Sequence, residues 1–316
     1  QVKAEFLHAY HAYEARAFPR DELKPASNTG IDNYNGWGVS VVDSIDTMLL
    51  MGCTEEYERA VSHVAQIDLA KTARQQPIPF FETTIRYLGG FLSAYALTKE
   101  PIFLSKADQL GQELLPAFET PTGIPVFAVD PKTGALAPRQ GKDTLLAEIG
   151  TFQLEFRQLA HWTGRAEYHD RATQMLKLLE RTQHNTTGLW GTVWDTANGN
   201  QKNNDLAVGG TADSAYEYII KAFLQGDKTE PQLRDMFIKV VDGIINNLLY
   251  ISPNRHLLYV TDVRHGRPSG KLEHLSCFLP GAIALGARYL DGEPGFSREM
   301  KRLWFWAAEG LGRTCW

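Results

Sequence analysis

Three acidic residues stand at similar intervals along the chain, each at the start of a segment with helical periodicity. They are Glu82, Glu148 and Asp213, which are 66 and 65 residues apart. Paired carboxyl groups serve glycoside hydrolysis, in which one protonates the leaving oxygen and the other activates water or attacks the sugar. Acids in a first helical turn also complement the helix dipole, and this capping interpretation is favoured for any one of them. Their shared position in a repeat favours one common site.

Aromatic residues near these acids have two interpretations. The residues concerned are placed either to stack on sugar rings or to fill the core; they are Trp37, Phe81, Trp190 and Trp194.

The sequence contains no G-x-S-x-G, Walker A or H-E-x-x-H motif, and no Cys/His cluster with zinc spacing. Catalysis by carboxyl groups is therefore the hypothesis that the sequence favours.

The elements that would position these acids repeat with the same period. Each acid begins an expected inner helix, and a fourth such segment spans residues 274–290. Glycines that would end helices follow at Gly164, Gly226 and Gly292. Expected outer helices span 102–118, 166–181, 231–249 and 297–310, the third with Pro231 in its first turn. Segments 124–129, 189–194 and 257–261 have strand character and predict hairpins or extended loops.

A repeated inner helix, outer helix and β-like loop must stack to bury its apolar faces. We expect a closed ring of helix pairs, with the inner helices' N-terminal ends at one mouth, so that Glu82, Glu148 and Asp213 surround a shared cavity. The alternative is an open solenoid of helix pairs, in which the acids are helix-start charges.

Composition narrows the class of protein. The 316 residues are 43% hydrophobic and 22% charged with a net charge of −5, which is typical of a globular domain and gives no reason to expect nucleic acid. No apolar run is long enough for a transmembrane helix. Gln1 is not an initiator residue, so processing or trimming is expected. The sequon at Asn185 is compatible with secretion and is a glycosylation candidate.

Five blocks, in order, carry a resemblance to a known family. They begin at Trp37 (WGVSVVDSIDTM), Phe81 (FETTIRYLGG), Ala147 (AEIGTFQLEFR), Gly209 (GGTADSAYEY) and His274 (HLSCFLPG). Together they resemble the class I α-mannosidases, glycoside hydrolase family 47.

The resemblance implies a mainly α fold, an α/α toroid of the (α/α)7 type. It implies inverting, exo-acting hydrolysis of α-1,2-linked mannose on oligomannose N-glycans, bound Ca²⁺, and a secreted or endomembrane location in the ER or Golgi lumen. Glu82 and Asp213 match the family's essential carboxylates, with the proton donor left open between them.

Further residues match the family's positions. Arg86, Glu148 and His274 match pocket residues that would hold the sugar, and Cys277 and Cys315 fit the characteristic disulfide. Cys53 would then be a free, buried thiol. Thr211, two positions before Asp213, differs from the Arg or Leu expected there, so branch preference stays open.

The resemblance also predicts what this chain lacks. Seven helix pairs at this repeat length need more residues than are present, and the Arg-Pro-Glu and Thr-Glu-Ala-His blocks are absent. We expect a single catalytic-type domain over residues 1–316 with four to five helix pairs and the C-terminal part of the barrel missing. The calcium ligand threonine belongs to a missing block, so no metal ligand is expected in this chain.

Two other functions remain open. A mannose-glycan-binding, lectin-like protein of glycoprotein quality control needs the pocket without full catalysis. A different α/α-toroid hydrolase would act on glucans or another polysaccharide, because one fold hosts many functions. Glycan binding without mannose release favours the first, and a substrate panel distinguishes the second.

Overall fold

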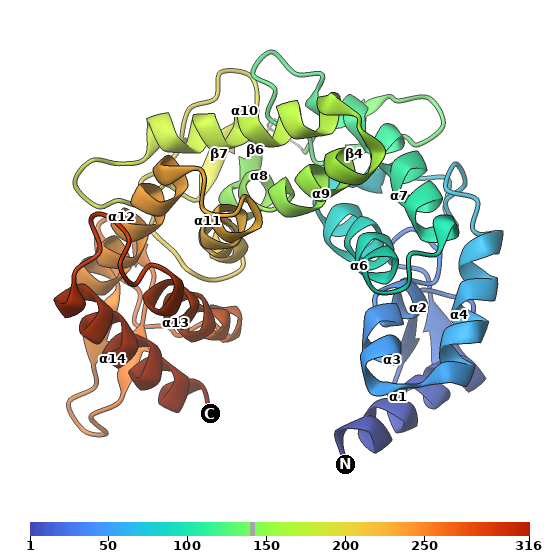
Figure 1. The fold of residues 1–316 in the computed structure, drawn as a ribbon, viewed down its shortest axis with the longest axis horizontal. Coiled ribbons are helices and arrows are strands. Elements are labelled where there is room, and N and C mark those ends of the chain that lie inside the picture. Colours follow the sequence, from blue (N-terminus) through green and yellow to red (C-terminus); the bar gives the residue numbers. More distant parts are fainter. Residues whose placement is uncertain (140–142) are drawn as a thin grey trace. The chain divides into compact units, whose positions relative to one another are not determined.

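A computed structural model describes residues 1–139 and 143–316 (Figure 1). The chain folds mainly into α-helices, which are α1 (Val2–Arg16), α2 (Val39–Val42), α3 (Ile45–Met51), α4 (Thr54–Gln66), α5 (Phe80–Glu82), α6 (Gly89–Thr98), α7 (Pro101–Leu114), α8 (Leu146–Gly150), α9 (Gln153–Thr163), α10 (Ala166–Thr182), α11 (Asp213–Gln225), α12 (Pro231–Asn247), α13 (Leu279–Tyr289) and α14 (Arg298–Cys315). The π-helix η1 (Thr83–Leu88) and the 3₁₀-helices η2 (Leu115–Phe118) and η3 (His274–Phe278) complete the helical elements in these ranges.

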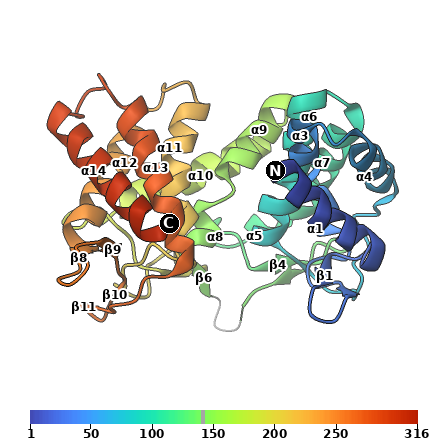
Figure 2. The ribbon, with the colours of Figure 1, turned by 90° about the horizontal axis from the view of Figure 1, so that it is seen from below.

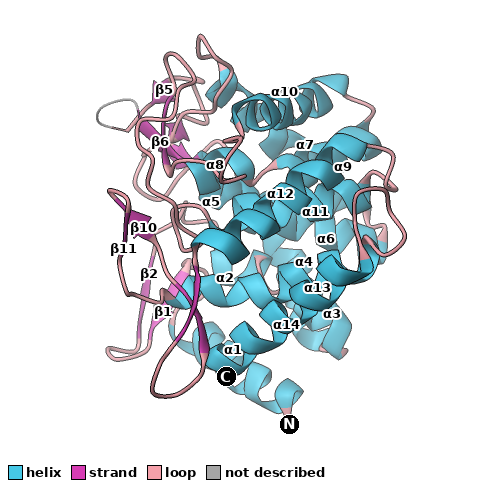
Figure 3. Cartoon of the chain, turned by 90° about the vertical axis from the view of Figure 1, so that its left-hand side faces the viewer, coloured by secondary structure: helices cyan, strands magenta, loops and turns pink. Residues whose placement is uncertain are grey.

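Short antiparallel strands lie in the segments that connect the helices (Figure 3). They pair as β1 (Glu22–Lys24) with β2 (Thr29–Ile31), β3 (Ile78–Pro79) with β4 (Ala128–Val129) and β4 with β5 (Leu136–Ala137), β6 (Asp143–Leu145) with β7 (Val193–Asp195), β8 (Leu249–Ile251) with β9 (Leu258–Val260), and β10 (Val263–Arg264) with β11 (Arg267–Pro268). The three segments with strand character supply β4, β7 and β9, which confirms that prediction.

The chain divides into two compact units. Unit 1 comprises residues 1–120, 125–139 and 155–171, and unit 2 comprises residues 121–124, 140–154 and 172–316. The single domain over residues 1–316 stays a prediction.

Unit 1 is built from helix pairs packed over an aromatic core. Helix α3 packs against α4 and α6, and α6 packs against α7. The rings of Phe80, Phe118, Phe156 and Tyr168 lie 5.1–5.9 Å apart in a chain of edge and tilted contacts, and all four are buried. Such geometry is preferred by aromatic pairs. Phe80 precedes Glu82 by two residues, so this core fixes the helix start that carries the first acid.

Unit 2 repeats the arrangement with α11 beside α12 and α13 beside α14, and α11 also contacts α8 and α13 (Figure 2). Trp304 of α14 is fully buried and contacts the rings of Phe237 and Phe296. Gly286 of α13 permits this packing, because a Cβ there would lie 2.4 Å from Phe237 and 2.9 Å from Trp304. The inner helix α13 is thereby held close to both outer helices.

The four expected outer helices correspond to α7 with η2, α10, α12 and α14, within a few residues at each end. The expected inner helices are present but less regular. The second is interrupted between α8 and α9, where the side-chain amide of Gln153 accepts from the Phe152 N–H and donates to the Ile149 carbonyl. The amide thus replaces backbone hydrogen bonds at the break. The first contains the π-helix η1, and the fourth begins as the 3₁₀-helix η3.

Across residues 1–139 and 143–316, no helix combines the length and hydrophobicity that crossing a bilayer requires.

Candidate active site

Glu82 and Arg86 lie one helical turn apart in unit 1 and form an ion pair. Glu82 ends α5, and Arg86 lies within η1. The Arg86 Nε donates to Glu82 Oε2 at 2.7 Å, and both side chains are about one-third exposed. A π-helical turn displaces side chains from ordinary helical positions and is frequent at functional sites. The structure therefore brings together the predicted acid and one predicted sugar-binding residue.

The same guanidinium contacts a second carboxylate that sequence reasoning did not assign to the site. Arg86 Nη1 donates to Asp43 Oδ2 at 3.2 Å, and the guanidinium carbon lies 4.9 Å from the centre of the Tyr34 ring. Burial raises the pKa of Asp43, Arg86 opposes that shift, and the neighbouring Asp46 and Glu82 charges add to it. Arg86 thus links two acids and an aromatic face. The only signal for Asp43 was its place in the block that begins at Trp37.

A buried carboxylate holds this cluster in place. Asp21 is fully buried, and four backbone N–H groups of the segment Tyr34–Val39 donate to its oxygens at 2.8–3.1 Å. The Tyr87 hydroxyl also donates to it, at 2.9 Å. Asp21 therefore fixes the segment that leads to Asp43 and the residue after Arg86. A carboxylate that accepts so many hydrogen bonds has a structural function, which no pattern in the sequence indicated.

In unit 2, Glu148 caps the N-terminus of α8, which is the alternative interpretation given for these acids. Its Oε2 accepts from the Leu145 N–H at 2.9 Å and from the Thr144 hydroxyl at 3.1 Å, and the residue is 8% exposed. These contacts join β6 to the first turn of α8, as an N-terminal carboxylate typically does. Its predicted role in sugar binding stays a prediction.

Asp213 begins α11 and is half-buried. Its Oδ1 accepts from the Ser214 N–H at 2.6 Å and the Ser214 hydroxyl at 3.0 Å, and the Thr151 hydroxyl donates to the Ser214 hydroxyl at 2.8 Å. Burial raises the pKa of Asp213, the contacts with Ser214 lower it, and the charges of Glu273 and Glu217 raise it further. A carboxyl group with a raised pKa is suited to proton transfer.

His274 begins η3, which contacts both α11 and α13. Its side chain is exposed. Unit 2 thus places the starts of α8, α11 and η3 near one another, through the contacts of α11 with both α8 and η3. Glu82 and Arg86 belong to unit 1, and the cavity shared by all predicted site residues stays a prediction.

The expected disulfide is present. Cys277 of η3 and Cys315 at the end of α14 are bonded, with their Cα atoms 5.8 Å apart, and Cys53 is free and buried. The bond closes a loop between positions 38 residues apart and ties the segment after His274 to the last helix.

Removing this disulfide should lower stability substantially. The double substitution Cys277→Ser/Cys315→Ser should lower the free energy of unfolding by about 3–4 kcal/mol, because an open loop of this length gives the unfolded chain more entropy. The measurement is the melting temperature with and without reductant. Reductant should destabilise the wild type and the Cys53→Ala control but leave the double variant unchanged. An equal response of all three proteins would contradict the assignment.

Most of the aromatic residues considered for sugar stacking belong to the core. Trp37, Trp190 and Trp194 are 4%, 1% and 0% exposed, so their rings are not available to a ligand. Phe81, next to Glu82, is partly exposed. Asn185 lies exposed in the turn after α10.

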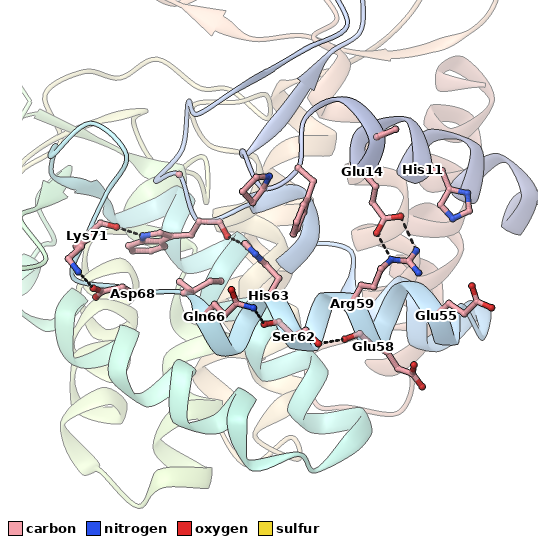
Figure 4. Close-up of a pocket in the computed structure, with 16 residues that line it drawn as sticks. His11, Glu14, Glu55, Glu58, Arg59, Ser62, His63, Gln66, Asp68 and Lys71 are labelled. Atoms are coloured by element: carbon pink, nitrogen blue, oxygen red, sulfur yellow. Dashed lines mark hydrogen bonds and ion pairs between the residues drawn. The ribbon is translucent and has the colours of Figure 1, made fainter.

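A groove in unit 1 lies away from Glu82 and Arg86. It has a volume of about 1230 Å³ and lies between α1 and α4; neither Glu82 nor Arg86 lines it, although the buried Trp37 does. Several of its polar side chains have partners: Arg59 with Glu14 at 2.8 Å, Lys71 with Asp68 at 2.6 Å, and His63 with a backbone carbonyl at 2.9 Å (Figure 4).

A calcium site does not fit the residues described here. Calcium takes six to eight oxygen ligands. Within residues 1–139 and 143–316, no group of three or more His, Cys, Asp or Glu side chains is arranged to hold a metal ion.

Known proteins are similar to this chain over nearly its whole length. The family model described as "Glycosyl hydrolase family 47" matches residues 5–316. An endoplasmic reticulum mannosyl-oligosaccharide 1,2-alpha-mannosidase of Rattus norvegicus is 38% identical over 287 residues, covering 90% of this chain. The protein of the same description from Homo sapiens is 36% identical over 313 residues, covering 98% of this chain. The chain spans 43% of the length of each.

A solved structure has the same fold. The alpha-1,2-mannosidase from Trichoderma reesei superposes with a TM-score of 0.89 at 31% identity, covering 98% of this chain and 65% of that one. This likeness confirms the predicted fold class, mainly α and of the α/α type, and the resemblance noted from the five sequence blocks.

Proposed function

Because this chain belongs to glycosyl hydrolase family 47, we propose that it hydrolyses terminal α-1,2-linked mannose from oligomannose N-glycans. The observation that carries the proposal is the family match over residues 5–316, a range that contains Glu82 and Asp213. The relatives from Rattus norvegicus and Homo sapiens are described as mannosyl-oligosaccharide 1,2-alpha-mannosidases, and the Trichoderma reesei protein as an alpha-1,2-mannosidase. The enzyme would be a mannosyl-oligosaccharide 1,2-α-mannosidase.

The proposed mechanism is inverting and uses two carboxyl groups. One protonates the leaving glycosidic oxygen, and a carboxylate on the opposite face activates the water that attacks the anomeric carbon. Glu82 and Asp213 are the two candidates for the proton donor, and we do not choose between them. The resemblance assigns the carboxylate that would activate the water to the Arg-Pro-Glu block, which these 316 residues do not contain. Asp213 is the group with the raised pKa, and Glu82 is held by Arg86.

The remaining predicted residues bind the sugar in this proposal. Arg86 has further N–H groups for sugar hydroxyls beside its two carboxylate partners. His274 is exposed at the start of η3 and donates or accepts according to its tautomer. We assign Glu148 to sugar binding from its match to the family's pocket residues. These groups would hold the terminal mannose ring in the site and keep out mannose residues joined by other linkages.

The proposal also covers the setting in which the protein acts. The relatives' descriptions name the endoplasmic reticulum, and the disulfide requires an oxidising compartment. We therefore place the protein in the secretory lumen or outside the cell, with oligomannose glycans or glycoproteins as its partners.

The test is mannose release by the purified protein, assayed with added calcium. The substrates are α-1,2-, α-1,3- and α-1,6-linked mannobiose, together with an α-linked glucan oligosaccharide. Release from the α-1,2-linked disaccharide alone, with β-mannose as the first anomer seen by NMR, is the expected result because inversion of an α linkage yields the β product. α-Mannose as the first product would contradict the inverting mechanism.

Two other outcomes would contradict the proposal. Binding of oligomannose without release of mannose would favour the lectin-like function. Cleavage of the glucan in preference to the mannosides would favour a different polysaccharide hydrolase.

A further inference from the structure

A tight turn of unit 2 sets the backbone of Asp213. The Gly209 carbonyl accepts from the Ala212 N–H at 2.9 Å and from the Asp213 N–H at 2.8 Å. The first N–H groups of a helix need partners outside the helix, and here the turn supplies one for Asp213. The direction in which the Asp213 side chain leaves α11 therefore depends on where this turn is held.

A carboxylate 63 residues later in the chain holds the turn. Glu273 Oε1 accepts from the Gly210 N–H at 3.0 Å. Its other oxygen lies against Gly209, where a Cβ would be only 1.9 Å from Oε2 and 2.4 Å from the carboxyl carbon. No residue other than glycine leaves room for this contact. The Glu273 carboxylate thus contacts both glycines: Oε1 accepts the hydrogen bond from Gly210, and Oε2 packs against Gly209.

The far side of the turn is held from α8. The Thr211 carbonyl accepts from the Ala147 N–H at 3.1 Å, and Ala147 is adjacent to Glu148. Gly150 of the same helix packs against Ala215, since a Cβ at Gly150 would lie 2.3 Å from the Ala215 Cβ. The turn is therefore held on one side by α8 and on the other by the hydrogen bond to Glu273, with the Leu275 side chain also against Gly210.

We propose that Glu273 is a positioning residue, whose carboxylate fixes the Gly209–Ala212 turn and so orients Asp213 for proton transfer. The inference rests on the proposed hydrolytic function of Asp213. Glu273 also immediately precedes His274, so one short segment both holds the turn and presents a predicted sugar-binding residue.

The charge of Glu273 has a second effect that gives a separate readout. Burial is the largest cause of the raised pKa of Asp213, and the Ser214 contacts oppose it. Glu273 from the segment before η3 and Glu217 on α11 are the neighbouring charges that raise the pKa further. Neutralising Glu273 while keeping its acceptor should therefore lower the pKa of Asp213 without releasing the turn.

The experiment compares Glu273→Ala, Glu273→Gln and the control Glu299→Gln, an exposed glutamate on α14 of the same unit. Two quantities are measured: hydrogen exchange of segment 208–214 by mass spectrometry, and kcat and KM on α-1,2-linked mannobiose across pH. Glu273→Ala should speed exchange by about tenfold, because one hydrogen bond is lost. It should lower kcat by about 10- to 100-fold with little change in KM, because a small misplacement of a catalytic group has this effect.

Glu273→Gln keeps an acceptor for Gly210, so it should restore slow exchange and most of kcat, and should shift the pH-profile inflection of Asp213 to lower pH. Wild-type exchange and kcat in Glu273→Ala would overturn the inference. So would a loss in Glu273→Gln as deep as in Glu273→Ala. A wild-type protein that releases no mannose would refute the proposed function, and the exchange data would still decide whether Glu273 holds the turn.

Discussion

Glu82→Gln should lower the turnover of α-1,2-linked mannobiose by about 10²–10⁴-fold, the usual contribution of a positioned acid or base. Glutamine has the shape of glutamate and still accepts from Arg86 Nε, but it neither gives nor takes a proton at neutral pH. The loss should therefore appear in kcat, while KM changes little. Initial rates of mannose release over a range of substrate concentrations measure both parameters.

The fold should survive this substitution, which separates a catalytic role from a structural one. The ion pair between Glu82 and Arg86 is about one-third exposed, and pairs of this kind contribute about 1 kcal/mol or less. The melting temperature of Glu82→Gln should thus lie close to that of the wild type. Glu58→Gln, an exposed glutamate on α4, is the matched control and should keep full turnover. Undiminished turnover in Glu82→Gln would remove Glu82 from the site.

Helix positions were predictable because each helix is specified locally. The outer helix α12 begins at Pro231 and carries apolar residues at helical spacing, and both signals lie within its own seventeen residues. The interruptions of the inner helices were not predictable in the same way. The break between α8 and α9 depends on the Gln153 amide bonding to two neighbouring backbone groups, and glutamine is otherwise a good helix former.

The candidate site was predictable only in part, for a related reason. Glu82, Glu148 and Asp213 share a place in the repeat, so sequence spacing singles them out, whereas Arg86 was predicted from the resemblance to the family. The groups that hold them come from distant positions. Asp43 reaches Arg86 across 43 residues, and Glu273 reaches Gly210 across 63. Such pairings are set by tertiary packing and leave no periodic trace in one sequence.

The aromatic residues show the same limit. Trp190 and Trp194 lie four residues apart in a strand-like segment, a placement equally suited to stacking on a sugar and to filling a core. Burial decides between these, because both indoles donate to backbone carbonyls at 3.0 Å inside unit 2. A buried tryptophan with a satisfied N–H is a core residue.

Asp21→Asn should be among the most destabilising conservative substitutions in unit 1. The wild-type carboxylate accepts five hydrogen bonds, and both oxygens are used. An asparagine offers one oxygen, and its NH₂ group would face N–H or O–H donors where an acceptor is needed. Leaving buried donors unsatisfied costs about 1–3 kcal/mol each, so we expect a loss of about 3–5 kcal/mol in the free energy of unfolding. Urea denaturation of purified protein measures it.

The loss should extend to the site, because Asp21 joins the segment before Asp43 to Tyr87, the neighbour of Arg86. A variant that still folds at low temperature should therefore show weakened turnover, since Arg86 no longer has a fixed position against Glu82. Asp32→Asn is the control: Asp32 is half-buried and accepts one hydrogen bond from the Asp21 N–H at 3.2 Å, so its loss should stay below about 1.5 kcal/mol. Equal stability of Asp21→Asn and Asp32→Asn would show that the segment Tyr34–Val39 is held by its own packing, with Asp21 dispensable.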